Sequence, residues 1–222
     1  MATLDDADIA AATIGELQPY AVTVHLEEYN PAWSTWYAEE EAAIRAALGD
    51  VAVRIEHTGS TSVPGLAAKA LIDILLLVPD AAEEAAYLPA LEAAGYALRI
   101  RQPDWYQHRC LVRRVESGAP WSVNLHVLSP ESGAPEIERI LAFRDRLRTH
   151  DDDRTYYEQA KRELAQRRWK FVQHYANAKS EIIEEILGRA LSGWTFGYRS
   201  ARMDYISTRA RDRPARGTGG PR

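Results

Sequence analysis

The chain has 222 residues, 46% of them hydrophobic and 27% charged, which is the composition of an ordinary globular domain with a substantial core. Its formal net charge of −5 argues against a general nucleic-acid binder, because such proteins carry a surplus of lysine and arginine. The single cysteine, Cys110, cannot form an internal disulfide and gives no sign of an oxidising compartment.

The sequence shows no signal peptide, because no basic segment followed by an apolar run stands near its start. The longest apolar run, 71–78, is too short to cross a membrane and is interrupted by Asp73. We therefore expect a cytoplasmic protein without a membrane partner. The oligomeric state is left open.

The first half of the chain predicts a sheet with two helices. Residues 1–18 are acidic and rich in alanine and predict a loose arm or frayed helix. Short runs of alternating or continuous apolar residues predict strands, and Asn30-Pro31 is typical of a helix start. The predicted strands are 20–26, 51–57, 71–78, 96–100, 109–115 and 121–128, and the predicted helices are 31–48 and 81–94, with a helical turn at 66–69.

From about residue 135 the pattern is helical, with predicted helices at 135–147, 152–168 and 171–190. The run Asp151-Asp152-Asp153 is interpreted as the negatively charged start of a helix and not as a metal site. We expect an α+β fold with a mixed sheet and a helical C-terminal portion. The domain would span 19–190, between the arm 1–18 and an aromatic, then arginine-rich extension at 191–222.

The segment from Gly59 to Asp73 has the pattern of a phosphate-binding turn. Gly59 allows close approach of a ligand to the backbone, and the hydroxyls of Ser60, Thr61 and Ser62 can donate hydrogen bonds. Asp73, on the next strand, would hold Mg²⁺ that bridges phosphates. Lys69 would meet a phosphate as a point charge. A plain connection rich in turn-forming residues is the alternative interpretation.

Asp73 lies between Leu71-Ile72 and the run Ile74 to Leu77, where an unpaired carboxylate is costly to bury. A bound metal ion or a paired side chain would remove that cost, which favours a functional role. Exposure at the end of the strand is the other explanation.

Four segments carry a resemblance to a known family: HTGSTSVPGLAAKALIDI, NLHV, FRDRLR and the later Tyr and Lys pattern. Over about 20–190 the chain resembles the GrpB family, which by fold belongs to the DNA polymerase beta-like nucleotidyltransferase superfamily. The resemblance implies that fold. Because the family's biochemical role is poorly defined, it implies the reaction less strongly.

The superfamily pattern has a Gly-Ser pair, two acids two residues apart on a strand, and a third acid on a neighbouring strand. Gly59-Ser60 and Asp73 match it, but position 75 is Leu, and the neighbouring strand offers Asn124 and His126. Two-metal catalysis needs several anionic oxygens, so the chain would bind one metal ion or none.

These departures make His57, Asn124 and His126 candidates for acid/base or substrate-orienting work, because histidine titrates near neutral pH. We expect His57 and His126 to lie on adjacent strands and to face a shared cleft. Histidines that only hydrogen-bond a loop are the alternative.

The helices offer further candidates for an anionic substrate. Arg144 and Arg148 are four residues apart and so lie on one helix face, as do Tyr157 with Lys161 and Tyr175 with Lys179. A solvated helix face for the arginines, and packing with extended lysines for the other pairs, are the alternatives.

Three hypotheses follow for the function. The first is a transferase that acts on a small molecule by nucleotidyl transfer, with Mg²⁺ and a nucleoside triphosphate as cofactors. The second is an enzyme on the same scaffold that performs acid/base or condensing chemistry on an amino-acid-like molecule without a nucleotide. The third is a non-catalytic ligand-binding module. Fold alone cannot choose between them.

Overall fold

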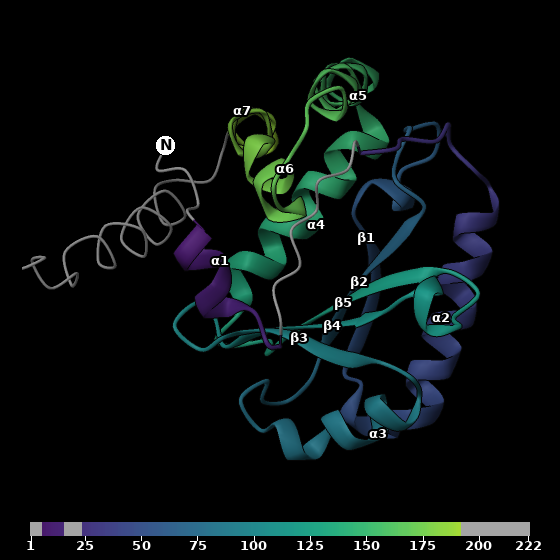
Figure 1. Ribbon diagram of the computed structural model, residues 1–222, viewed down its shortest axis with the longest axis vertical. Coiled ribbons are helices and arrows are strands. Elements are labelled where there is room, and N and C mark those ends of the chain that lie inside the picture. The colour runs from purple at the N-terminus through teal and green to yellow at the C-terminus, as the bar shows by residue number, and fades with distance from the viewer. Residues whose placement is uncertain (1–5, 16–23, 192–222) are drawn as a thin grey trace, which may run out of the picture.

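The structure is a computed structural model that describes residues 6–15 and 24–191. A five-stranded sheet separates two groups of helices (Figure 1). The strands are β1 Arg54–Thr58, β2 Leu71–Leu77, β3 Ala97–Gln102, β4 His108–Arg113 and β5 Ser122–Leu128. The helices are α1 Asp6–Ala12, α2 Ala32–Leu48, α3 Leu88–Ala93, α4 Ala134–Thr149, α5 Asp151–Ala165, α6 Val172–Ala178 and α7 Ser180–Ala190.

The strand order is β1-β2-β5-β4-β3. Strands β2 and β5 pair in parallel, and the other neighbours are antiparallel. The expected α+β fold with a mixed sheet and a helical C-terminal portion is therefore confirmed. Strand β2 lies between β1 and β5, as its nearly continuous apolar sequence predicts for a strand covered on both faces.

One face of the sheet is the apolar core. Ile72, Ile74 and Leu76 of β2 are fully buried there, packed with Trp33 and Ile44 of α2. Each such side chain contributes roughly 1.5–3 kcal/mol through the surface it removes from water. Helices α2 and α3 cover this face (Figure 1).

The opposite face carries polar residues between two apolar clusters. Near the ends of β2 and β5, Leu75 and Leu77 pack against Ile137 of α4. A second cluster joins α4, α5 and α7, and includes Leu147 and Tyr157. Helices α4 to α7 therefore lie over this face (Figure 1). Near the start of β2 the same face carries Asp73, with Asn124 opposite it on β5.

A buried carboxylate links α2 to the far strands. Glu40 is 1% exposed and accepts hydrogen bonds from Trp121 Nε1 at 2.7 Å, from Arg113 and from the Tyr96 hydroxyl. Three donors offset the cost of burying this charge. Glu40 therefore serves the packing of the core.

Several element boundaries differ from the sequence prediction. The helix expected at 81–94 is reduced to α3, because Asp80 accepts a hydrogen bond from the backbone of Ala82 in a local turn and α3 begins with proline in its first turn. The helix expected at 171–190 is divided into α6 and α7 at Lys179.

The prediction of a helical turn at 66–69 was wrong. Ala68 instead forms an antiparallel bridge with Glu27, and the short 3₁₀ turn lies earlier, at Ser60–Ser62. Most of the expected strand 20–26, part of the arm 1–18 and the extension from residue 192 onward lie outside the described residues.

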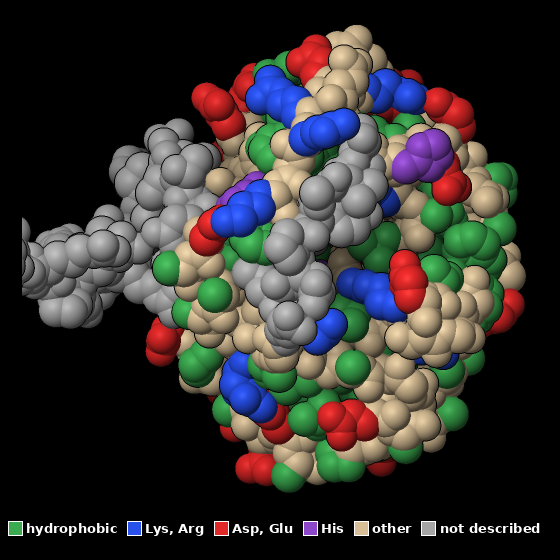
Figure 2. Space-filling view, in the orientation of Figure 1, with side chains coloured by type: hydrophobic (Ala, Val, Ile, Leu, Met, Phe, Trp, Pro, Cys, Tyr) green, Lys and Arg blue, Asp and Glu red, His purple; other side chains and the backbone are tan. Residues whose placement is uncertain are grey.

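The described part of the surface in Figure 2 mixes basic, acidic and hydrophobic side chains, without one continuous basic stripe. Across 6–15 and 24–191, every helix is too short or too polar to span a bilayer.

Candidate functional site

The polar centre of the sheet is built by three residues that lie directly opposite one another. Thr58 pairs with Asp73, and Asp73 pairs with Asn124. Asn124 Nδ2 donates a hydrogen bond of 2.8 Å to Asp73 Oδ1, and Arg114 Nη2 donates one of 2.6 Å to Asn124 Oδ1. Asp73 Oδ2 accepts no hydrogen bond from the described residues.

Gly59 brings the turn after β1 against the Asp73 carboxylate. Its φ is +65°, a region that favours glycine. A Cβ at this position would lie 2.8 Å from the Asp73 Cβ and 2.9 Å from its Cγ, which is closer than real contacts allow. The glycine is therefore required both by the backbone conformation and by the neighbouring acid.

Three lysines from distant parts of the chain converge near this acid. Lys161 is 2% exposed, and its Nζ donates to the Ala67 carbonyl and, at 3.2 Å, to Ser60 Oγ. Lys69 and Lys179 lie 5.7 and 4.8 Å from the centre of the Tyr175 ring. Within the described part of the chain, Lys69 and Lys179 donate no hydrogen bond.

Burial lowers the pKa of all three lysines. For Lys69 burial, then the nearby Lys179, lower the pKa to about 8, against an opposing effect of Asp73. Burial and Lys179 lower the pKa of Lys161 to about 7. Burial also lowers the pKa of Lys179, while Asp73 raises it. The three ammonium groups share a poorly solvated space, in which Asp73 acts on Lys69 and Lys179 and Glu158 acts on Lys161.

The residues around Asp73 do not fit a two-metal site. Leu75, where the superfamily has its second acid, is 1% exposed and packs in the apolar cluster with Ile137. Asn124, opposite Asp73, directs an amide donor at the carboxylate. Across the described residues, no three His, Cys, Asp or Glu side chains converge as metal ligands. Three nearby ammonium groups also oppose a divalent cation.

Glu56 does not supply the missing carboxylate. It accepts hydrogen bonds from Arg144 Nη1 at 2.6 Å and from Arg54 Nε at 2.8 Å. Arg144 also donates to Asp145 at 2.7 Å and to the His57 carbonyl at 3.1 Å. Arg144, predicted as a substrate ligand, is thus used to fix α4 against β1.

The expectation that His57 and His126 lie on adjacent strands and share a cleft was wrong. Strand β2 separates β1 from β5, and His57 points to the core face, opposite to Asp73. Its ring stacks on Tyr37, with centroids 4.6 Å apart. Burial, then Arg148 and Arg144, lower its pKa to about 4, so the ring is neutral at pH 7.

His126 shares the face of Asp73 and belongs to a chain of hydrogen bonds. Its Nδ1 lies 2.9 Å from His108 Nε2, and His108 Nδ1 lies 2.8 Å from Gln102 Oε1. Because the Gln102 oxygen only accepts, His108 donates to it and accepts from His126 Nδ1–H. Burial lowers the pKa of both histidines, which favours neutral rings.

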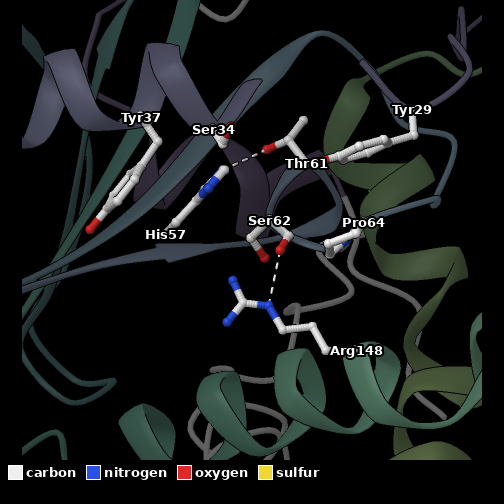
Figure 3. A pocket seen from close by; sticks show the side chains of 8 residues that line it. All are labelled: Tyr29, Ser34, Tyr37, His57, Thr61, Ser62, Pro64 and Arg148. Atoms are coloured by element: carbon white, nitrogen blue, oxygen red, sulfur yellow. Dashed lines mark hydrogen bonds between the residues drawn. The ribbon is translucent and has the colours of Figure 1, made fainter. Parts of the chain in front are cut away.

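A separate cavity of about 400 Å³ is lined by Thr61 and Ser62 of the 59–62 turn, and neither Asp73 nor the three lysines line it (Figure 3). Arg148 reaches it from α4, with its Nε donating to the Ser62 carbonyl at 2.9 Å. The lining residues are Tyr29, Ser34, Tyr37, His57, Thr61, Ser62, Pro64 and Arg148.

Apart from Arg144, which is paired with Glu56 and Asp145, the predicted site residues fall into two groups. One gathers around Asp73 and contains Gly59, Ser60, Lys69, Asn124, His126, Tyr157, Lys161 and Lys179. The other lines the cavity and contains His57, Thr61, Ser62 and Arg148.

Sequence reasoning missed several contributors. Arg114 donates a hydrogen bond to Asn124, and the spacing of the two residues in the sequence does not predict that contact. His108 and Gln102 pair directly across the β3–β4 hairpin, so a correct hairpin register would have found them. Tyr175 was considered only together with Lys179, with packing as the alternative, and the contact of its ring with Lys69 was not predicted.

A Gly-Ser turn after β1, an acid on the adjacent strand β2 and a mixed sheet flanked by helices together define a fold of the DNA polymerase beta-like nucleotidyltransferase type. Within that class the chain belongs to the GrpB family, whose family model, described as GrpB protein, matches residues 23–189.

Similar proteins agree with this assignment. The chain is 50% identical over 185 residues to UPF0157 protein BH1888 of Halalkalibacterium halodurans, covering 83% of this chain and 91% of that protein. It is 44% identical to UPF0157 protein SCO7215 of Streptomyces coelicolor, covering 78% and 87%. The crystal structure of conserved protein GrpB from Enterococcus faecalis matches with a TM-score of 0.67 and 30% identity, over 77% of this chain and 99% of that one.

The close approach of Gly59 to Asp73 gives a stability prediction. In Gly59→Ala the new Cβ must displace the carboxylate and strain the backbone, so we expect a loss of at least about 3 kcal/mol in urea unfolding. Gly49→Ala is the matched control, because its φ is +53° but no atom lies within 4 Å of the added Cβ. It should lose less than Gly59→Ala, about 1–3 kcal/mol, because only backbone strain is added there. Equal losses in the two variants would contradict the contact.

Proposed function

We propose that this chain is an enzyme of the transferase kind that holds a small anionic substrate between Lys69, Lys161 and Lys179, beside Asp73. The observation that carries the proposal is the pair Lys69 and Lys179. Both ammonium groups are partly buried against Tyr175 and donate no hydrogen bond within the described part of the chain. Poorly solvated cations without acceptors are costly, and an anion between them removes that cost.

The polar side chains around Asp73 suggest separate roles in substrate binding and catalysis. The lysines neutralise a phosphate or carboxylate, and Ser60, which is 3.2 Å from Lys161 Nζ, offers a hydroxyl at the same place. Asp73 Oδ2 is left to accept a proton or a hydrogen bond from the group that attacks. Asn124 fixes the carboxylate through its other oxygen, and His126 lies on the same face of the neighbouring strand.

Magnesium-dependent nucleotidyl transfer is the second candidate, and the nucleotidyltransferase-like fold with its Gly59-Ser60 turn favours it. Dephospho-CoA kinase of Mycolicibacterium paratuberculosis is also similar, at 27% identity. The match spans only 46% of that protein, so we do not assign a kinase activity to this chain from it. The lone acid at Asp73 favours charge neutralisation by lysines over neutralisation by metal ions.

Calorimetric titration with pyrophosphate tests the proposal. The wild-type chain should bind pyrophosphate without Mg²⁺, and Lys179→Gln should weaken binding about tenfold or more through the loss of a charge-assisted contact. Lys170→Gln is the matched control, because Lys170 is exposed and paired with Asp6. The proposal fails if wild type does not bind, or if Lys179→Gln binds as wild type does.

Asp73→Asn, titrated in the same way, separates the two candidates. If lysines alone neutralise the anion, removal of the nearby negative charge strengthens pyrophosphate binding. If Asp73 holds Mg²⁺, the variant loses Mg²⁺-dependent binding of ATP, CTP or GTP. Tight nucleotide binding that requires both Mg²⁺ and Asp73 would replace the proposal by the second candidate.

The lowered lysine pKa values predict how anion binding depends on pH. A depressed pKa means that the ammonium form is present below it and is lost as pH rises through it. Sulfate, whose charge is constant, should therefore bind at least about tenfold more weakly at pH 9 than at pH 6.5, because Lys161 and Lys69 titrate near pH 7 and 8. Lys69→Arg should reduce this pH dependence, since guanidinium stays charged. Constant affinity in the wild-type chain would contradict the assignment.

A further inference from the structure

The cavity beside His57 is separated from the lysine cluster by the turn 59–62. Ser60 directs its hydroxyl toward Lys161, whereas Thr61 and Ser62 line the cavity. The volume of the cavity, about 400 Å³, lies in the range of small-molecule sites. No residue of the cavity touches Asp73 through a hydrogen bond. The cavity therefore needs an explanation of its own.

Arg148 supplies an available cationic group in this cavity (Figure 3). Its Nε is used by the Ser62 carbonyl, and the nearest carboxylate to its terminal nitrogens, that of Asp145, lies 3.7 Å from Nη1. Asp145 is engaged more closely by Arg144, at 2.7 Å. The Nη atoms of Arg148 make no hydrogen bond within the described residues, so they can take a carboxylate in a forked arrangement.

His57 supplies an acceptor. Thr61 donates its hydroxyl proton to the Leu71 carbonyl at 3.2 Å, so it accepts the proton of His57 Nε2 at 3.1 Å. A neutral ring protonated at Nε2 leaves a lone pair on Nδ1, and that atom has no partner among the described residues. A ligand that fits must bring a hydrogen-bond donor to this ring.

The charge around the ring selects the type of donor. Arg144 reaches the His57 carbonyl at 3.1 Å, and both Arg144 and Arg148 act on the ring as positive charges. An ammonium donor would be repelled there, and a hydroxyl would not. Tyr37, stacked on His57, and Tyr29 provide aromatic walls for an apolar group.

We propose that this cavity is a second ligand site, which takes a small α-hydroxy carboxylate with an apolar or aromatic side chain. The carboxylate lies on the Arg148 guanidinium, and the hydroxyl donates to His57 Nδ1. The apolar group packs against Tyr29, at the end of the cavity opposite Tyr37 (Figure 3). One guanidinium balances one carboxylate, whereas the Arg144 nitrogens are already paired with Glu56 and Asp145 and are not available to bind a second carboxylate.

Calorimetric titration with three ligands of one shape tests the chemistry. We expect 3-phenyllactate to bind best, 3-phenylpropionate about fivefold more weakly for want of the hydroxyl, and L-phenylalanine more weakly still because of its ammonium group. The assignment is overturned if 3-phenyllactate does not bind, or if L-phenylalanine binds as well as it does.

Variants locate the binding. Arg148→Gln should weaken 3-phenyllactate about tenfold or more, whereas Arg45→Gln, which removes an exposed arginine paired with Glu41, should leave affinity unchanged. Because Arg148 also holds the Ser62 carbonyl, His57→Phe is the second variant, with thermal unfolding as the check of folding. It should abolish the preference for 3-phenyllactate over 3-phenylpropionate. Unchanged affinity in Arg148→Gln, or unchanged preference in His57→Phe, would overturn the assignment.

This second site stands independently of the proposed function. Lys179→Gln should leave 3-phenyllactate binding intact, and Arg148→Gln should leave pyrophosphate binding intact. If Lys179→Gln abolishes 3-phenyllactate binding, the carboxylate occupies the lysine cluster and the cavity assignment is wrong.

Discussion

The hydrogen bond from Asn124 to Asp73 joins the parallel strands β2 and β5 on the face covered by α4 to α7. The polar centre is organised around this bond. The bond orients one carboxylate oxygen, while the other accepts no hydrogen bond from the described residues. Gly59 can approach this carboxylate only because it lacks a side chain and adopts positive φ. The turn that follows then sends Ser60 toward the lysines and Thr61 into the neighbouring cavity.

Around that bond, lysines are found where a two-metal site would have further carboxylates. A two-metal site concentrates carboxylates to hold cations, whereas this centre keeps Asp73 and surrounds it with Lys69, Lys161 and Lys179. Burial lowers the pKa of each lysine, which is the cost of collecting like charges in a poorly solvated space. We propose a bound anion because it would remove that cost, whereas a divalent cation would add to it.

The sequence predicted what depends on local pattern. It found the buried strand β2, the Gly59 turn and the unusual acid at Asp73, because period, turn chemistry and a lone charge can be read locally. The sequence did not predict that Lys69 and Lys179 lie at the same tyrosine ring. That proximity depends on how helices 110 residues downstream fold over the sheet. The order of the strands in the sheet also could not be predicted from the sequence. For that reason His57 and His126 were assigned to neighbouring strands.

The most direct test of the account is anomalous diffraction from crystals of the chain that contain selenate, with parallel crystals that contain Mn²⁺. We expect a selenium peak placed so that the selenate oxygens accept hydrogen bonds from the Lys69 and Lys179 ammonium groups, beside the ring of Tyr175. We expect no pair of manganese peaks at Asp73. Two manganese ions coordinated by Asp73, with no selenate near the lysines, would contradict it.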